Sequence, residues 1–79
     1  MTREEVFAGL KEVLAIIRPN TDLSTVNENT ELVRELGIDS LSMLLLSLAV
    51  EEKFQMRFDP SAPAPVTVGQ VIDAVLAAL

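Results

Sequence analysis

Leu36-Gly37-Ile38-Asp39-Ser40-Leu41 is the stretch of sequence that decides how this chain folds. Gly37 allows a tight turn into the helix that follows. Asp39 is a suitable N-cap, because its carboxylate accepts amide hydrogens of the first turn and faces the positive end of the helix dipole. The apolar run after it predicts a central helix from Asp39 or Ser40 to near Phe54.

Ser40 falls on the first turn of this predicted helix, with its hydroxyl free to point outwards. A phosphate ester on that hydroxyl would lie at the helix N-terminus, where the amide dipoles favour anions. A bare Asp-Ser pair is more often a helix cap alone. The surrounding sequence has to decide between a cap and a modification site.

Two further helices are predicted, one on each side of the central helix. Thr2 and Glu5 have the spacing of a capping box, and apolar residues then recur at helical intervals over Thr2 to Ile17 until Pro19 forbids continuation. Thr67 with a glutamine three residues later repeats the spacing, and a single apolar stripe follows from Thr67 to Leu79.

The two segments that connect these helices have different sequence patterns and predict different local structures. The long loop from Arg18 to Asp39 contains Thr30–Leu36, which reads as one or two helical turns ended by glycine. Asp59–Ala62 is compatible with one capped turn, and Pro63 and Pro65 prevent anything longer. We therefore predict an all-α fold, a small four-helix bundle of three main helices plus one short, proline-limited helix, in a single domain over residues 1–79.

Composition excludes several classes of function. Twelve acidic against six basic residues give a net charge of −6, which disfavours nucleic-acid binding and favours basic surfaces on protein partners. With no histidine and no cysteine, the usual nucleophile and general-base arrangements are missing, so no catalytic residue is predicted. No metal-binding spacing, signal peptide or membrane span is evident. A monomeric cytoplasmic protein is expected.

The central helix has apolar residues on both sides. One apolar stripe runs through Met43, Leu46 and Val50 and continues to Phe54. The other consists of leucines and continues to two glutamates; its residues are Leu41, Leu44, Leu45, Leu48, Glu51 and Glu52. Since charges belong in water, the first stripe should face the core. Leu44, Leu45 and Leu48 should then be at least partly exposed, as at an interaction site. The alternative is that the long loop or the proline-rich 59–65 segment covers them.

At the opening stretch the chain resembles the acyl carrier protein family, whose signature Leu-Gly-x-Asp-Ser-Leu is met in full by residues 36–41. Val50–Phe54 is similar to the close of that family's second helix, and Thr67-Val68 to the opening of its fourth. The resemblance implies that Ser40 receives 4′-phosphopantetheine from coenzyme A. A separate magnesium-dependent holo-synthase, a phosphopantetheinyl transferase, makes the transfer, and acyl-loading and acyl-processing enzymes act on thioesters held by the arm. The carrier itself catalyses nothing.

The chain also departs from the family pattern. Fatty-acid carriers commonly have acidic residues at the positions of Ser42 and Leu45, and here both charges are absent. This favours dedicated partners of a specialised, polyketide-like acyl pathway over those of fatty acid biosynthesis. The family's short third helix, which moves to admit the acyl chain, is replaced by a proline-rich stretch. The residues predicted to contact partners are Asp39, Leu41, Leu44, Leu45, Leu48, Glu51 and Glu52.

Two alternatives to an acyl carrier remain at this point. An aminoacyl or peptidyl carrier uses the same arm with a different cargo. An unmodified helical interaction module would dock a partner helix on Leu44, Leu45 and Leu48 and would use Ser40 only at the cap. Replacement of Ser40 by alanine separates a carrier from such a module.

Overall fold

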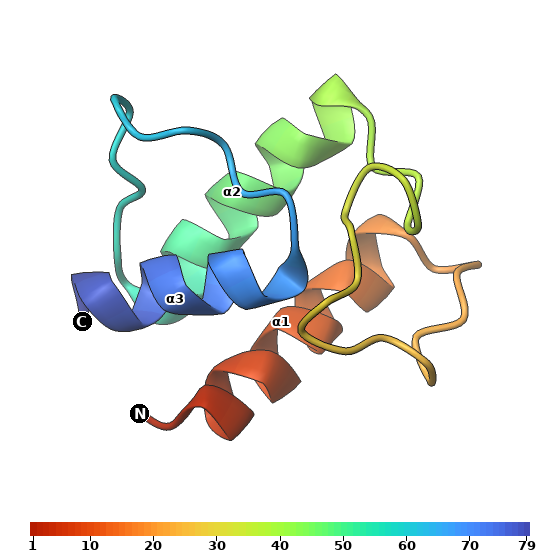
Figure 1. Ribbon diagram of the computed structural model, residues 1–79, viewed down its shortest axis with the longest axis horizontal. Helices are drawn as coiled ribbons and strands as arrows, with labels where there is room; N and C mark the ends of the chain where they lie inside the picture. Colours follow the sequence, from red (N-terminus) through yellow and green to blue (C-terminus); the bar gives the residue numbers. More distant parts are fainter.

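The computed structural model describes residues 1–79 and contains three α-helices and no β-strand (Figure 1). The helices are α1 (Arg3–Ile17), α2 (Ser40–Phe54) and α3 (Val68–Ala78). All three were predicted from the sequence, and their bounds agree with the predicted ones to within a residue at each end. The all-helical class is therefore confirmed.

Side-chain caps set the start of each helix. Thr2 and Glu5 form a reciprocal capping box, in which the Glu5 amide donates to Thr2 Oγ1 over 3.2 Å and the Thr2 amide donates to Glu5 Oε1 over 2.9 Å. Thr67 Oγ1 accepts the Gln70 amide over 3.2 Å at the start of α3. The Gln70 side chain, however, accepts from the Val66 amide and not from Thr67, so the second box is only half formed.

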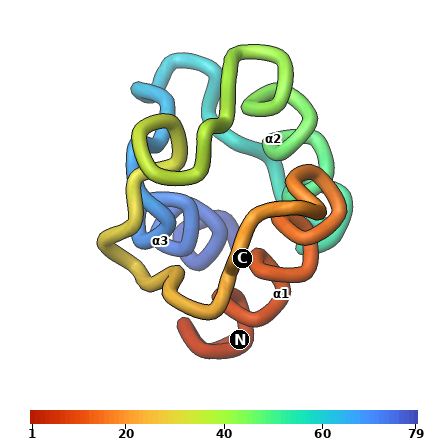
Figure 2. The backbone as a smooth tube through the Cα atoms, turned by 90° about the vertical axis from the view of Figure 1, so that its right-hand side faces the viewer, coloured from red at the N-terminus to blue at the C-terminus, as the bar shows by residue number.

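The core is one cluster of sixteen buried apolar residues that draws on all three helices and on the segments between them. α1 packs against both α2 and α3 (Figures 1 and 2). Gly9 makes the approach of α1 to α2 possible, because a Cβ atom there would lie 2.7 Å from the Phe54 ring. The cluster consists of Val6, Leu10, Val13, Leu14, Val26, Leu32, Leu36, Ile38, Leu46, Val50, Phe54, Met56, Val68, Val71, Ile72 and Val75.

The long loop between α1 and α2 is fastened to the start of α3. Three backbone hydrogen bonds join them, from the Leu32 amide to the Val66 carbonyl (2.9 Å), from Val68 to Thr30 (3.0 Å) and from Gly69 to Glu28 (2.8 Å). In Figure 2 the loop runs beside the start of α3. The bonds from Val68 and Gly69 satisfy amides that the first turn of α3 leaves without an internal partner.

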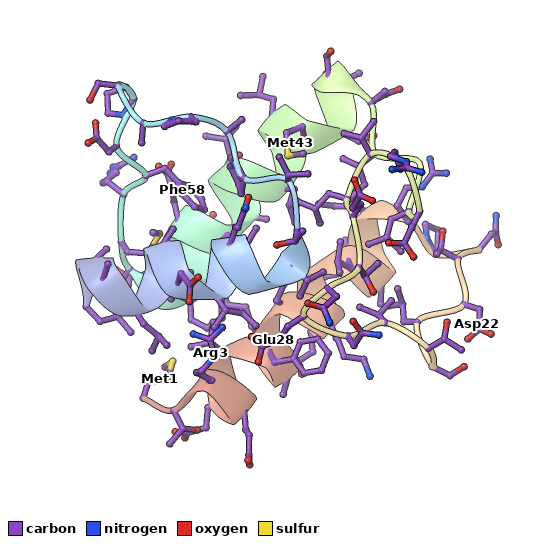
Figure 3. All side chains as sticks on the ribbon, in the orientation of Figure 1. Met1, Arg3, Asp22, Glu28, Met43 and Phe58 are labelled. Atoms are coloured by element: carbon purple, nitrogen blue, oxygen red, sulfur yellow. The ribbon has the colours of Figure 1, made fainter.

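Arg3 adds a charged link on the same side of the molecule. Its guanidinium group pairs with the carboxylate of Glu28 in the long loop and with that of Asp73 on α3. Figure 3 shows the Arg3 side chain directed toward Glu28, between α1 and the loop. The long loop is thus held by α1 and α3 together, which fixes the direction in which the chain enters α2.

The predicted fourth, proline-limited helix does not form. Residues 59–62 make a single turn, in which the Ala62 amide donates to the Asp59 carbonyl over 3.1 Å. Pro60, Pro63 and Pro65 supply no amide donors, and each proline disfavours helical geometry in the residue before it. The bundle therefore has three helices, and residues 55–67 connect α2 to α3 as an arched loop (Figure 1).

Candidate functional site

The start of α2 exposes Ser40 and caps the helix through Asp39. Asp39 Oδ1 accepts the Ser42 amide over 2.8 Å, and the Asp39 carbonyl accepts the Met43 amide over the same distance. Ser40 is the first helical residue and is exposed. The cap does not use the Ser40 hydroxyl, so a group attached to that oxygen leaves the helix start intact.

The turn before the site has a defined geometry. Gly37 has a φ of 65°, in the left-handed region, and its amide donates to the Val33 carbonyl over 3.2 Å. A Cβ atom on Gly37 would lie 3.2 Å from Nη2 of Arg18, so the guanidinium group of Arg18 occupies the space that a side chain would fill. Ile38 is fully buried and anchors the turn in the core directly before the exposed Asp39.

Asp39 is held in its charged form. The hydrogen bond from the Ser42 amide lowers the pKa of the Asp39 carboxyl below its ordinary value of 3.8, and the positive charge of Arg18 lowers it further. The cap is therefore fully ionised at neutral pH. Its negative charge also lies at the positive end of α2, where it stabilises the helix.

The predicted division of α2 into two faces is confirmed. Leu46, Val50 and Phe54 are buried, and Met43 is half-buried against the same core. On the opposite side lies the leucine face, Leu41, Leu44, Leu45 and Leu48, whose side chains are between 49% and 66% exposed. The alternative that the long loop or the 59–65 segment covers these leucines is therefore wrong.

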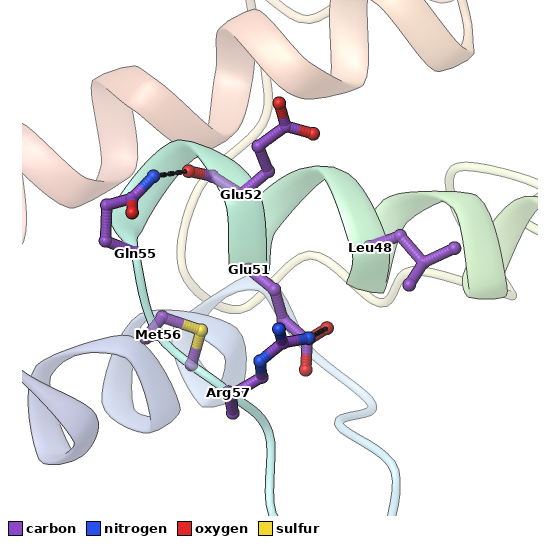
Figure 4. Close-up of a pocket in the computed structure, with 6 residues that line it drawn as sticks. All are labelled: Leu48, Glu51, Glu52, Gln55, Met56 and Arg57. Atoms are coloured by element: carbon purple, nitrogen blue, oxygen red, sulfur yellow. Dashed lines mark hydrogen bonds and ion pairs between the residues drawn. The ribbon is translucent and has the colours of Figure 1, made fainter.

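Glu51 and Glu52 have different surroundings at the end of α2. Glu51 Oε2 accepts the Phe58 amide over 2.9 Å, and its side chain is only 16% exposed. Glu52 is exposed. Both line an open hollow with Leu48, Gln55, Met56 and Arg57, and Figure 4 shows Glu51 directed toward Arg57 while Glu52 extends away from it. Both were predicted to contact partner proteins, and Glu52 is the more accessible of the two.

A groove of about 730 Å³ lies between α2, the 57–65 segment and α3. Met43 and Phe58, which are labelled in Figure 3, line it from α2 and from the beginning of the segment. Its other lining residues are small or apolar for the most part, and they are Ser47, Arg57, Asp59, Pro60, Ala62, Pro63, Ala64, Pro65, Gln70, Ala74, Ala77 and Ala78. The groove is large enough to take part of an apolar chain.

The sequence analysis did not predict this groove or the part that α3 has in it. Ala74, Ala77 and Ala78 recur at helical spacing on α3, beside its buried stripe. That run of small residues was the available signal, because alanines leave space beside a helix where larger side chains would fill it. The position of Arg18 beside the Gly37 turn could not be predicted either, because no pattern in the local sequence indicates this contact.

None of the three helices is long and apolar enough to cross a lipid bilayer. No group of three or more histidine, cysteine, aspartate or glutamate side chains is arranged to hold a metal ion.

Comparison with known proteins defines the class of protein to which this fold and site belong. The family model described as a phosphopantetheine attachment site matches residues 6–75. The acyl carrier protein of Wolinella succinogenes is 37% identical over 68 residues, which cover 85% of this chain and 88% of that protein. The acyl carrier protein of Helicobacter pylori is 41% identical over 70 residues, covering 87% and 83%. That of Acidothermus cellulolyticus is 32% identical over 78 residues, covering 95% and 89%.

The match over residues 6–75 makes the chain a phosphopantetheine-binding carrier. With relatives of this identity over most of its length, it belongs to the acyl carrier protein family. Its prosthetic group is accordingly a covalently attached 4′-phosphopantetheine, and the chain is a carrier and not an enzyme. Its partners are a phosphopantetheinyl transferase and enzymes that handle acyl groups.

Proposed function

We propose that Ser40 is the residue that carries 4′-phosphopantetheine and that acyl groups are held as thioesters on the thiol of this arm. The observation that supports this most strongly is the exposed Ser40 at a helix start that Asp39 caps alone. The hydroxyl is reachable by a transferase. The phosphate of the attached group would lie beside the free amide dipoles of the first turn, which favour a negative charge.

The groove supports a carrier of acyl groups in particular. It borders α2, the helix that begins at Ser40, and most of its wall is alanine, proline and apolar side chains. An acyl chain gains free energy from burial at about 25 cal/mol for each Å² of apolar surface removed from water. This lining favours an acyl cargo over the aminoacyl or peptidyl cargo that the sequence alone left open.

Loading of the unmodified protein tests the proposal. The protein is incubated with coenzyme A, magnesium and a promiscuous phosphopantetheinyl transferase, and its intact mass is measured. We expect a gain of one phosphopantetheine in the wild type and in Ser42→Ala, a matched control on the same helix turn, and no gain in Ser40→Ala. A gain in Ser40→Ala would place the arm on another residue.

We further propose that the leucine face, with Asp39 and Glu52, is where partner enzymes bind. An exposed apolar strip on an otherwise acidic small domain is a common mark of a protein interaction site. Glu51 is a weaker candidate for partner contact than the sequence suggested, since one of its oxygens already accepts the Phe58 amide. The unmodified interaction module would use the same leucines, and the loading experiment decides between the two functions.

The same surface supports a proposal about the pathway. Leu45 stands where fatty-acid carriers commonly have an acidic residue, and its side chain is 49% exposed. A partner that recognises leucine here must itself present an apolar surface. We therefore propose a specialised, polyketide-like acyl pathway, with fatty acid biosynthesis as the alternative. We also propose that the protein acts as a monomer in the cytoplasm, which sedimentation of the loaded protein and cell fractionation would test.

A further inference from the structure

Arg18 is the one basic residue of the chain whose side chain has no acidic or aromatic partner. Every other basic side chain has one, and the pairs are Arg3 with Glu28 and Asp73, Arg34 with Glu31, Lys53 with Glu12, Arg57 with Glu51, and Lys11 over the Phe7 ring. No carboxylate lies within ion-pair distance of Arg18, although acidic residues outnumber basic ones by twelve to six. Arg18 is therefore the cation that is free to bind a further anion.

The Arg18 side chain lies beside the turn that leads to Ser40. Arg18 directly follows α1, and it is half-buried. Its Nη2 and Cζ atoms lie 3.2 Å and 3.9 Å from the position that a Cβ atom on Gly37 would take. Gly37 and Ser40 are three residues apart, so their Cα atoms are separated by at most about 11 Å. The guanidinium group is thus held next to the stretch of backbone that carries Ser40.

The charge of Arg18 also reaches the acidic group next to Ser40. The hydrogen bond from the Ser42 amide lowers the pKa of the Asp39 carboxyl most, and the positive charge of Arg18 lowers it further without an ion pair between the two side chains. A phosphate ester on Ser40 Oγ would place a second anion beside the Asp39 carboxylate, and two like charges so close repel each other. A cation near both anions relieves that repulsion.

We propose that Arg18 binds the phosphate of the 4′-phosphopantetheine arm. Arginine suits this role, because its planar guanidinium group presents several donors that match the oxygens of a phosphate. An interaction of this kind limits the motion of the first part of the arm and offsets the charge that the arm adds to an acidic domain. The inference rests on the proposed function, since it requires the arm to be on Ser40.

A purely structural role for Arg18 is the alternative. Arg18 lies at the C-terminal end of α1, where a positive charge interacts favourably with the helix dipole, and it fills the space beside Gly37. Both effects are present before loading and do not depend on the arm. An interaction that appears only after loading therefore separates phosphate binding from a structural role.

Thermal unfolding of the unloaded and the loaded protein measures that interaction. We expect the Tm difference between the wild type and Arg18→Gln to be about 2–4 °C larger in the loaded protein than in the unloaded one. Arg18→Lys keeps the charge without the planar donors and should lie between the two. The extra difference should largely disappear in about 1 M salt, where charges are screened over about 3 Å.

Arg57→Gln is the matched control. It removes the same charge from a side chain that is 88% exposed and lies beyond the far end of α2, on the order of 20 Å along the helix from Ser40. Loading should change the Tm of Arg57→Gln as it changes that of the wild type. An equal extra difference in Arg57→Gln and Arg18→Gln would overturn the proposal, because it would report net charge alone.

NMR of the arginine side chains gives a second readout, which needs no substitution. Loading should shift the Nε–Hε resonance of Arg18 and leave that of Arg57 in place. The phosphorus resonance of the attached arm should in turn differ between the wild type and Arg18→Gln. An Arg18 resonance that did not move on loading would refute phosphate binding.

Intact mass, measured on every sample before unfolding, separates the failure of this inference from that of the proposed function. If Ser40 takes up no phosphopantetheine, the proposed function fails and the inference falls with it. If Ser40 is loaded and Arg18→Gln lowers the Tm equally in both forms, Arg18 has only a structural role. The inference is then wrong, and the proposed function stands.

Discussion

The two faces of α2 have nearly the same composition, but one is buried and the other is exposed. Leu46, on the inner face, is 2% exposed, whereas Leu48, two residues further on, is 53% exposed. Both are leucines on one helix, so apolar content alone does not decide which of them is buried. The difference comes from what each stripe joins at the end of the helix, Phe54 on the inner side and two glutamates on the outer side. The inner face holds the fold together, and we propose that the outer face serves function.

The largest effect should come from the inner face. Leu46→Ala leaves a cavity in the core and should lower the free energy of unfolding by about 2–5 kcal/mol, a large part of the total for a domain of this size. Leu48→Ala removes the same atoms from an exposed position and should change it by about 0.5 kcal/mol or less. Urea denaturation followed by circular dichroism measures both. Equal losses in the two variants would contradict the division into faces.

The outer face should affect partners without affecting stability. Leu45→Glu should lower kcat/KM for a phosphopantetheinyl transferase that loads the wild type about tenfold, since apolar contacts of this kind contribute about 1–3 kcal/mol. Ile16→Glu is the matched control, because Ile16 is an exposed apolar residue on α1. If Leu45→Glu left binding to its native partners unchanged as well, recognition through the leucines would be refuted.

The turn that leads into α2 should show an intermediate effect. Gly37→Ala forces an L side chain into a φ of 65° and against the Arg18 guanidinium group, 3.2 Å away. We expect a loss of about 1–2 kcal/mol in the free energy of unfolding. Gly37→Asn should cost less, because asparagine tolerates the left-handed region better. An alanine variant as stable as the wild type would show that the turn does not need this conformation.

The smallest effect concerns the cap of α2 and its dependence on pH. The folded pKa of Asp39 is lowered, so its contribution to stability is present above the ordinary value of 3.8 and is lost as the pH falls through the folded pKa. The stability difference between the wild type and Asp39→Asn should therefore be constant near neutral pH and shrink in acid. Thermal unfolding at several pH values measures it. A difference that grew in acid would contradict the assigned cause.

The sequence was sufficient for the helices and for the inner face of α2. A capping residue lies directly before the helix that it caps, and helical periodicity is visible within a short stretch of sequence. Thr2, Asp39 and Thr67 therefore predicted where the three helices begin. The same local signals predicted Ser40 on the first turn of α2, and the resemblance of residues 36–41 to the acyl carrier signature made it the candidate attachment residue. Whether it carries the arm remains a prediction.

Contacts between segments that are distant in the sequence could not be predicted from capping residues or helical periodicity. The pairing of Glu31 with Thr67 and the link of Arg3 to Glu28 and Asp73 join residues that no local pattern connects. The groove likewise depends on where the 57–65 segment lies relative to α3. The predicted short helix failed for a local reason, because three prolines within six residues outweighed one suitable cap at Asp59.

The central claim is that α2 keeps its fold and its function on separate faces, with Ser40 on the functional one. Peptide mapping by mass spectrometry after phosphopantetheine loading, with unfolding measured on the same samples, tests it most directly. We predict the arm on Ser40 in the wild type, no arm in Ser40→Ala, and a free energy of unfolding within about 0.5 kcal/mol between the two. An arm found on Ser42, or a strongly destabilised Ser40→Ala protein, would contradict the account.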